Sequence, residues 1–152
     1  MKAQIDILKD ALTPHLDGML KRASSSGIRA YLSRVVYKQY QDAQIERWNT
    51  ENRSEGPRWK RLNPAYEKSK RKRFAKYPYG GTKMLVATGR LLKSVVGTDR
   101  RYHRRVVLHY AMEILVTLPY APNVNAERNF TQFGQRTKRE ILGGLKRHIL
   151  GK

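Results

Sequence analysis

Apolar residues recur at intervals of three and four positions in two stretches near the start of the chain. They are Ile5, Leu8, Leu12, Leu16, Met19, Leu20 and Ala23 in the first stretch, and Ile28, Leu32, Val35, Val36, Tyr40 and Ala43 in the second. This is the period of an α-helix that buries one face. Thr13 and Pro14 suit an N-cap and a first turn, so residues 5–23 are predicted to form two short helices or one kinked helix. The second stretch predicts a longer helix that ends near Trp48.

A strongly basic helix is predicted from Asn63 onward, because asparagine caps helices well and Pro64 suits the first turn. Between residues 66 and 76 the large apolar side chains are Tyr66 and Phe74, and most other positions are lysine or arginine. Such a helix does not belong to a core. We expect an irregular loop at residues 77–81 and a return to the core at residues 85–96.

Apolar and polar positions alternate between residues 104 and 118, with the apolar side chains at the even positions from 106 to 118. A period of two predicts a β-strand, either one long strand or two strands with a bend near Ala111. We expect residues 92–98 to form its partner strand in an antiparallel, half-exposed sheet. The polar segment 119–135 that follows is too long for a simple connection, which suggests exchange between subunits.

A terminal helix is predicted from Thr137, because Thr137 and Glu140 have the spacing of a capping box. Its apolar face consists of Ile141, Leu142, Leu145 and Ile149. Gly143 and Gly144 inside it each cost about 1 kcal/mol relative to alanine, so they are expected to mark close packing against a neighbour.

These elements predict one α+β domain over residues 1–152, with N-terminal helices, a small antiparallel sheet and a C-terminal helix. Residues 1–56 would form the helical part and residues 57–152 the remaining core. The chain has no cysteine, which excludes disulfides and thiolate chemistry. Asp6, Lys9 and Asp10 interrupt the N-terminal apolar positions, so we expect no signal peptide, no membrane span and synthesis in a cytoplasm.

The net charge of +20 changes the picture most, because such self-repulsion favours a partner that brings negative charge. The partner could be a nucleic acid, through its phosphates, or an acidic protein surface. The expected contact residues lie in the basic helix and the segment before it: Arg58, Lys60, Arg61, Lys68, Lys70, Arg71, Lys72, Arg73 and Lys76.

No catalytic, metal or cofactor site is expected. The few carboxylates are not paired with a histidine or a second carboxylate at a spacing that would form an active site. The four histidines are scattered without ligand spacing. Residues 80–83 lack the first glycine of a phosphate-binding loop.

One pattern of aromatic, glycine and leucine positions gives a more specific indication. It comprises Gly56, Trp59, Leu62, Pro64, Tyr66, Thr88, Gly89, Leu91 and Ser94, followed later by Tyr120, Ala121, Arg128 and Phe130. In this order the residues resemble the phage virion-morphogenesis or tail-completion family. Many members carry His-Gln-x-Gly after the Tyr-Ala pair, whereas residues 122–125 here read Pro-Asn-Val-Asn.

The resemblance implies a non-enzymatic α+β subunit that assembles with copies of itself into a ring, hexameric in that family. The ring would lie in the virion, at the neck or the head-proximal end of the tail, after assembly in the host cytoplasm. There it would close the tail and join it to the head, contacting neck, portal-side or tail-tube proteins. Tyr120, Ala121, Arg128 and Phe130 would belong to the subunit interface. Trp59, Leu62, Tyr66, Thr88, Gly89 and Leu91 would be structural.

A second hypothesis stands on charge alone. It is a monomeric or dimeric nucleic-acid-binding protein without catalytic activity, in which Arg58, Lys60, Arg61 and the cations between residues 68 and 76 hold phosphates. Both hypotheses treat Trp59 and Tyr66 as aromatic anchors of a core or an interface.

Overall fold

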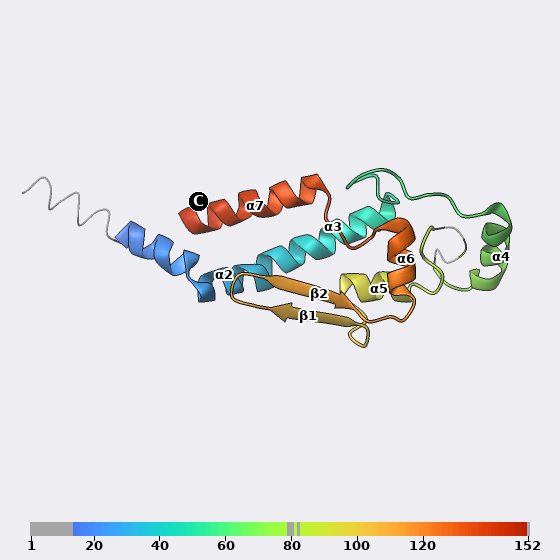
Figure 1. Ribbon diagram of the computed structural model, residues 1–152, viewed down its shortest axis with the longest axis horizontal. Coiled ribbons are helices and arrows are strands. Elements are labelled where there is room, and N and C mark those ends of the chain that lie inside the picture. The colour runs from blue at the N-terminus through green and yellow to red at the C-terminus, as the bar shows by residue number, and fades with distance from the viewer. Residues whose placement is uncertain (1–13, 79–80, 82, 152) are drawn as a thin grey trace, which may run out of the picture.

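The computed structural model describes residues 14–78, 81 and 83–151, and Figure 1 shows an elongated, mostly helical α+β chain. Residues 14–23 are helical within the described part of the chain. Thr13 lies outside the described residues, so the cap by Thr13 and Pro14 stays a prediction. The part of the first predicted helix before Pro14 lies outside the described residues.

The second predicted helix is confirmed as one continuous rod of three parts. These are α2 (Ser25–Tyr31), a π-helical turn η1 (Leu32–Val36) and α3 (Tyr37–Asn49). Ser24 caps α2 by accepting a hydrogen bond from the backbone N–H of Gly27 at 3.3 Å. The rod ends one residue after Trp48, where Glu51 and Asn52 adopt positive φ angles of 51° and 78° that turn the chain.

The strand predicted at residues 92–98 is wrong, because this segment is the short helix α5 (Arg90–Val96). Ser94 and Val95 are fully buried, and the Tyr40 hydroxyl of α3 donates a hydrogen bond to the carbonyl of Val95 at 2.9 Å. Burial against α3 therefore overrides the β-preference of the adjacent valines. Gly97 ends the helix with φ at 88°, a left-handed conformation that suits glycine.

The alternating segment forms both strands of the antiparallel sheet. Strand β1 (His103–Val107) pairs with β2 (Met112–Val116), with His103 opposite Val116 and Val107 opposite Met112. The alternative of two strands with a bend near Ala111 is thus confirmed. In β2 the even positions are half-buried and the odd positions are exposed, so one face of the hairpin faces the protein.

The segment predicted as a long polar loop contains the helix α6 (Ala121–Arg128). Within this helix, the side chain of Asn125 accepts hydrogen bonds from two backbone N–H groups that follow the helix, those of Phe130 at 2.9 Å and Thr131 at 3.2 Å. These bonds close the connection within the chain, so its length does not require exchange with a neighbour.

The terminal helix α7 (Gln135–Leu150) is confirmed, but the capping box is wrong. The helix begins before Thr137, whose buried hydroxyl donates a hydrogen bond to Glu55 at 2.5 Å. The expected close packing is found at Gly144, where an added Cβ would lie less than 3.0 Å from the Tyr31 hydroxyl. At Gly143 the nearest atom would be the flexible end of Arg147, 3.6 Å away.

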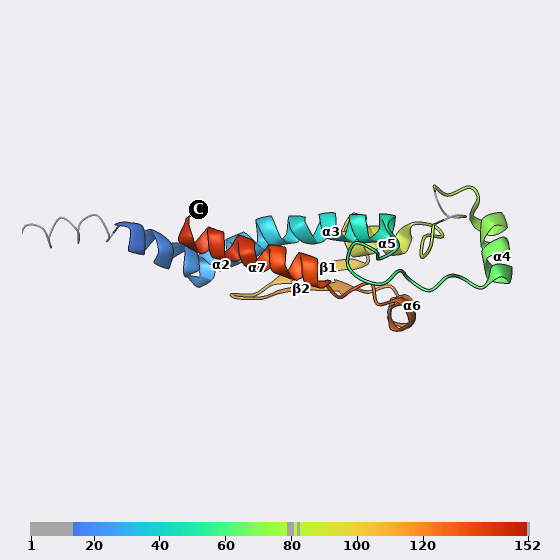
Figure 2. The ribbon, with the colours of Figure 1, turned by 90° about the horizontal axis from the view of Figure 1, so that it is seen from above.

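The core consists of side chains from α3 and α5, from the segments before and after α4, and from the residues around β2 and α6. Its buried members are Tyr40, Trp48, Trp59, Met84, Val86, Leu91, Val95, Leu118, Ala121 and Phe130. Trp48 and Trp59 meet edge to face with ring centroids 5.4 Å apart. Figure 2 shows that the helix α4 (Pro64–Phe74) lies beyond this core, at the end of the long axis opposite residues 14–23.

Candidate interaction site

The basic helix α4 begins as predicted. The side chain of Asn63 accepts a hydrogen bond from the backbone N–H of Ala65 at 2.9 Å, and Pro64 occupies the first helical position. Glu67 and Arg71 form an exposed ion pair one turn apart at 2.7 Å, which contributes about 0.3–0.5 kcal/mol. The helix ends at Phe74, two residues before Lys76.

The surface of α4 and of the segment before it is strongly cationic. Eight of the nine expected contact residues are exposed: Arg58, Lys60, Arg61, Lys68, Arg71, Lys72, Arg73 and Lys76. Within this set, Arg58 pairs with Glu51, and Arg71 pairs with Glu67. Figure 1 shows α4 at one end of the elongated chain, so the exposed cations of this helix lie at that end.

Lys70 departs from this expectation, because its side chain is buried with 3% of its surface exposed. Its ammonium group donates a hydrogen bond to the backbone carbonyl of Lys83. Burial lowers the pKa of Lys70, and the nearby carboxylates of Glu67 and Glu51 oppose that shift. Lys70 therefore attaches α4 to the segment after it and offers no free surface to a partner.

A cleft separates α4 from α5 and α6 and has a volume of about 610 Å³. We call it the α4–α6 cleft; it is lined by Leu62, Asn63, Tyr66, Lys70, Phe74, Leu85, Ala87, Thr88, Gly89, Arg90, Leu91, Tyr120, Val124, Glu127 and Arg128. Most of these side chains are apolar or aromatic, and three cations and a single carboxylate accompany them. Tyr66 and Tyr120 are 50% and 43% exposed, so the cleft has aromatic surface that the monomer leaves uncovered.

The Thr-Gly-x-Leu step forms one wall of this cleft. Gly89 precedes α5 with φ at 79°, a conformation that favours glycine, and the hydroxyl of Thr88 accepts a hydrogen bond from the backbone N–H of Arg90 at 3.4 Å. Leu91 is buried in the core directly behind the step. The three residues of the motif thus shape the start of α5.

The aromatic residues of the pattern divide between core and surface. Trp59 is 5% exposed and Leu62 packs against the core, as expected for structural residues. Tyr66 is not a core anchor, since half of its surface is exposed at the rim of the α4–α6 cleft.

Two of the four expected interface residues lie in the core of the monomer. Ala121 is 4% exposed and Phe130 is completely buried, with its ring 6.0 Å from that of Trp48. Neither presents a surface that a neighbouring copy could contact. Tyr120 lies at the cleft, and Arg128 crosses toward the α4 side, where its Nε donates to the carbonyl of Lys60 at 3.3 Å.

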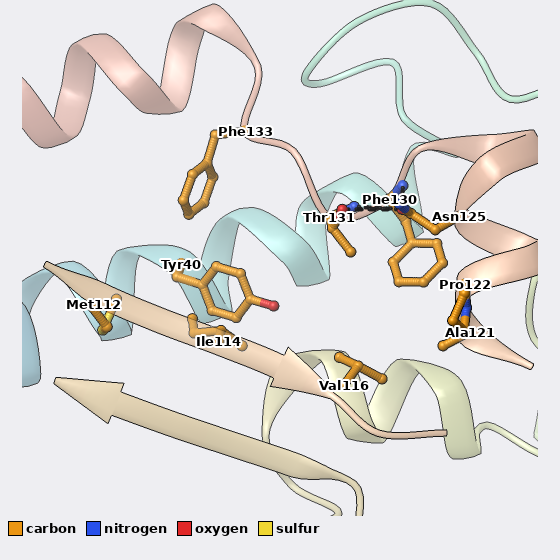
Figure 3. Close-up of a pocket in the computed structure, with 10 residues that line it drawn as sticks. All are labelled: Tyr40, Met112, Ile114, Val116, Ala121, Pro122, Asn125, Phe130, Thr131 and Phe133. Atoms are coloured by element: carbon orange, nitrogen blue, oxygen red, sulfur yellow. Dashed lines mark hydrogen bonds between the residues drawn. The ribbon is translucent and has the colours of Figure 1, made fainter. Parts of the chain in front are cut away.

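A smaller apolar groove of about 370 Å³ lies between β2 and α6 (Figure 3). Met112, Ile114 and Val116 line it on the hairpin side, and Phe130 and Phe133 line it on the other. Its ten lining residues are mostly apolar and include no carboxylate, histidine or lysine, so the groove can bind an apolar side chain. The hydroxyl of Tyr40, which also lines it, donates a hydrogen bond to the carbonyl of Val95.

The sequence reasoning missed three residues of the cleft, Arg90, Phe74 and Val124. For Arg90 a signal exists, because it directly follows the Thr-Gly step. The sequence contains no comparable signal that Phe74 and Val124 line the same cleft, because long-range packing brings α4 beside α6.

Within the described ranges, histidine, aspartate and glutamate form no group of three that could hold a metal ion. In the same part of the chain no helix is both long and apolar enough to cross a membrane. Comparisons of the sequence with known protein families and with curated proteins, and of the fold with solved structures, found no match.

Proposed function

We propose that this chain is a structural subunit of a tailed-phage particle, a neck or tail-completion protein that closes the head-proximal end of the tail and helps to join it to the head. Copies would form a ring, hexameric by resemblance, in contact with neck, portal-side or tail-tube proteins. The sequence pattern supports the proposal, since Trp59 and Leu91 are core residues and Thr88 and Gly89 shape a turn. Residues of this kind build a scaffold.

The observation that carries the proposal is the exposed cationic surface of α4 at one end of the chain. Subunits of charge +20 repel one another, so a ring of them requires negative charge nearby. An acidic face of a neck or tail protein, or the DNA that passes through the neck, would supply it. Lys70 supports the arrangement from within, by attaching α4 to residue Lys83.

A non-catalytic role is supported by the chemistry of the two concave sites described above. The groove beside β2 is apolar, and in the α4–α6 cleft Glu127 pairs with Arg128 at 2.8 Å while Lys70 bonds to a backbone carbonyl. These polar groups stabilise the fold around the cleft.

The test is a double charge reversal on α4. Arg71→Glu with Arg73→Glu should leave thermal unfolding nearly unchanged, because both side chains are exposed, yet heads and tails assembled with this variant should fail to join. Arg100→Glu with Arg101→Glu is the matched control, since it makes the same change of charge at exposed positions before β1. Normal infectious particles from the α4 variant would remove the role proposed for this helix.

The same run of exposed cations supports the second candidate, a nucleic-acid-binding protein. A monomer that binds duplex DNA with a steep salt dependence, which the α4 reversal weakens and the control reversal does not, would favour this candidate. Binding of tail or portal proteins with little affinity for DNA would favour the neck subunit.

A further inference from the structure

The first twenty residues differ in charge from the rest of this cationic chain. Residues 1–20 contain Asp6, Asp10 and Asp17 against Lys2 and Lys9, a net charge of −1, whereas the whole chain carries +20. The N-terminal segment therefore carries a small net negative charge, which cationic parts of the protein attract.

This segment also carries an apolar stripe in its sequence, and the described part of that stripe is exposed. Ile5, Leu8, Leu12, Leu16 and Leu20 follow one another at helical spacing. In the described part of the stripe, Leu16 and Leu20 are 52% and 69% exposed. Exposed leucines on one face of an amphipathic helix indicate a surface that binds a partner.

The α4–α6 cleft has the complementary properties. Its walls are apolar and aromatic, with Tyr66 and Tyr120 exposed, and Arg90 and Arg128 place positive charge in it against the single carboxylate of Glu127. An apolar segment that carries aspartates matches this surface in both polarity and charge.

The cleft and the N-terminal helix lie at opposite ends of the molecule. Figures 1 and 2 show residues 14–23 at one end of the long axis and α4 at the other, with α3 and α7 between them. An intact subunit therefore cannot bring its own Leu16 and Leu20 to its own cleft without refolding, whereas a second copy placed end to end can.

We propose that the N-terminal segment of one copy, residues 5–20, docks into the α4–α6 cleft of the next copy. The contact is head to tail, so each subunit donates one segment and receives another. Contacts of this type produce a closed ring when the rotation between copies closes, and an open filament when it does not. The inference rests on the proposed function, because it supplies the contact that the ring requires.

Because the chain has no cysteine, introduced cysteines can trap this contact without interference. Leu20→Cys and Tyr120→Cys would be made in separate full-length chains, mixed in equal amounts and oxidised, and the products resolved on a non-reducing gel. Leu142→Cys is the matched control acceptor, because Leu142 is an exposed apolar residue on α7, 65% exposed, outside the cleft. Circular dichroism checks that each variant is folded.

The expected result is a disulfide-linked heterodimer of the Leu20→Cys and Tyr120→Cys chains, in several-fold higher yield than with the Leu142→Cys chain. Adding Arg90→Glu to the acceptor should lower that yield. Equal yields with both acceptors, no heterodimer, or closure of the disulfide within one chain that carries both cysteines would overturn the docking.

The two proposals fail separately in these experiments. If trapping fails while charge reversal at Arg71 and Arg73 still prevents heads and tails from joining, the docking is wrong and the neck role stands. If trapping succeeds while that reversal has no effect on joining, the copies associate as proposed but α4 is not the joining surface.

Discussion

Replacing Trp59 by alanine should remove the largest single contribution of the segment between α3 and α4 to the core. The Trp59 ring is 5% exposed, meets Trp48 edge to face at 5.4 Å and lies 5.9 Å from the guanidinium of Arg47. A buried tryptophan covers roughly 150–250 Å², which at about 25 cal/mol per Å² amounts to about 4–6 kcal/mol as an upper bound.

One feature reduces this cost. Among the described residues the indole N–H of Trp59 has no hydrogen-bond partner although it is buried, and removing it relieves a desolvation penalty of about 1–3 kcal/mol. The aromatic contact with Trp48 adds roughly 0.5–1.5 kcal/mol in the other direction. Trp59→Ala should therefore lower the free energy of unfolding by about 3–5 kcal/mol, the usual range for a large aromatic residue in a core.

Urea denaturation followed by far-ultraviolet circular dichroism measures this loss without relying on tryptophan fluorescence. Trp59→Phe keeps an apolar ring and should cost less than about 2 kcal/mol. Tyr66→Ala, on the exposed face of α4, should stay within about 0.5 kcal/mol of the natural chain. A change below about 1 kcal/mol for Trp59→Ala would refute the packing of residues 57–63 on α3.

Two further changes test the packing of the α2–α3 rod. Gly144→Ala should lower the melting temperature because the new Cβ would collide with Tyr31 of α2, whereas Gly143→Ala should raise it through better helix propensity; equal effects in thermal scans would contradict the contact between α2 and α7. Burial raises the pKa of Tyr40 above its usual value of about 10; Tyr37 adds to this shift and Arg47 opposes it. The protonated Tyr40 therefore stabilises the fold below about pH 10, and this stabilisation is lost as the pH rises further. Tyr40→Phe should cost about 1 kcal/mol at neutral pH and weaken the alkaline loss; an unchanged alkaline profile in denaturant titrations would refute the assignment.

The elements that local patterns specify could be predicted from the sequence. The stripe from Ile28 to Trp48 gave the α2–α3 rod because apolar period and helix length agree, and Asn63 with Pro64 gave the start of α4. Alternation around Met112–Val116 gave the antiparallel sheet. In each case a local signal and the tertiary environment favour the same structure.

Where tertiary packing opposes the local signal, the predictions were wrong. Val95 and Val96 favour a strand, yet α5 is helical because Ser94 and Val95 pack against α3. Lys70 was expected at the surface with its neighbours, but a backbone carbonyl from a distant loop satisfies its charge in a buried position. Composition does not distinguish this lysine from the exposed lysines on the same helix.

The candidate site was predicted only in part. The cationic face of α4 could be read from charge, because exposed lysine and arginine side chains need no partner from elsewhere in the chain. The α4–α6 cleft could not, since it joins Tyr66, Arg90 and Tyr120 from three separate elements. For the same reason no local pattern indicates that Phe130 belongs to the core.

We propose that this subunit assembles with identical copies at the neck, with α4 toward an anionic neighbour. Electron cryo-microscopy of the assembled particle tests it most directly. We expect a closed ring of this chain between the head and the tail tube, with the exposed cations of α4 facing acidic protein or DNA. A particle that lacks the chain at that junction, or contains it there with α4 directed into empty solvent, would contradict the account.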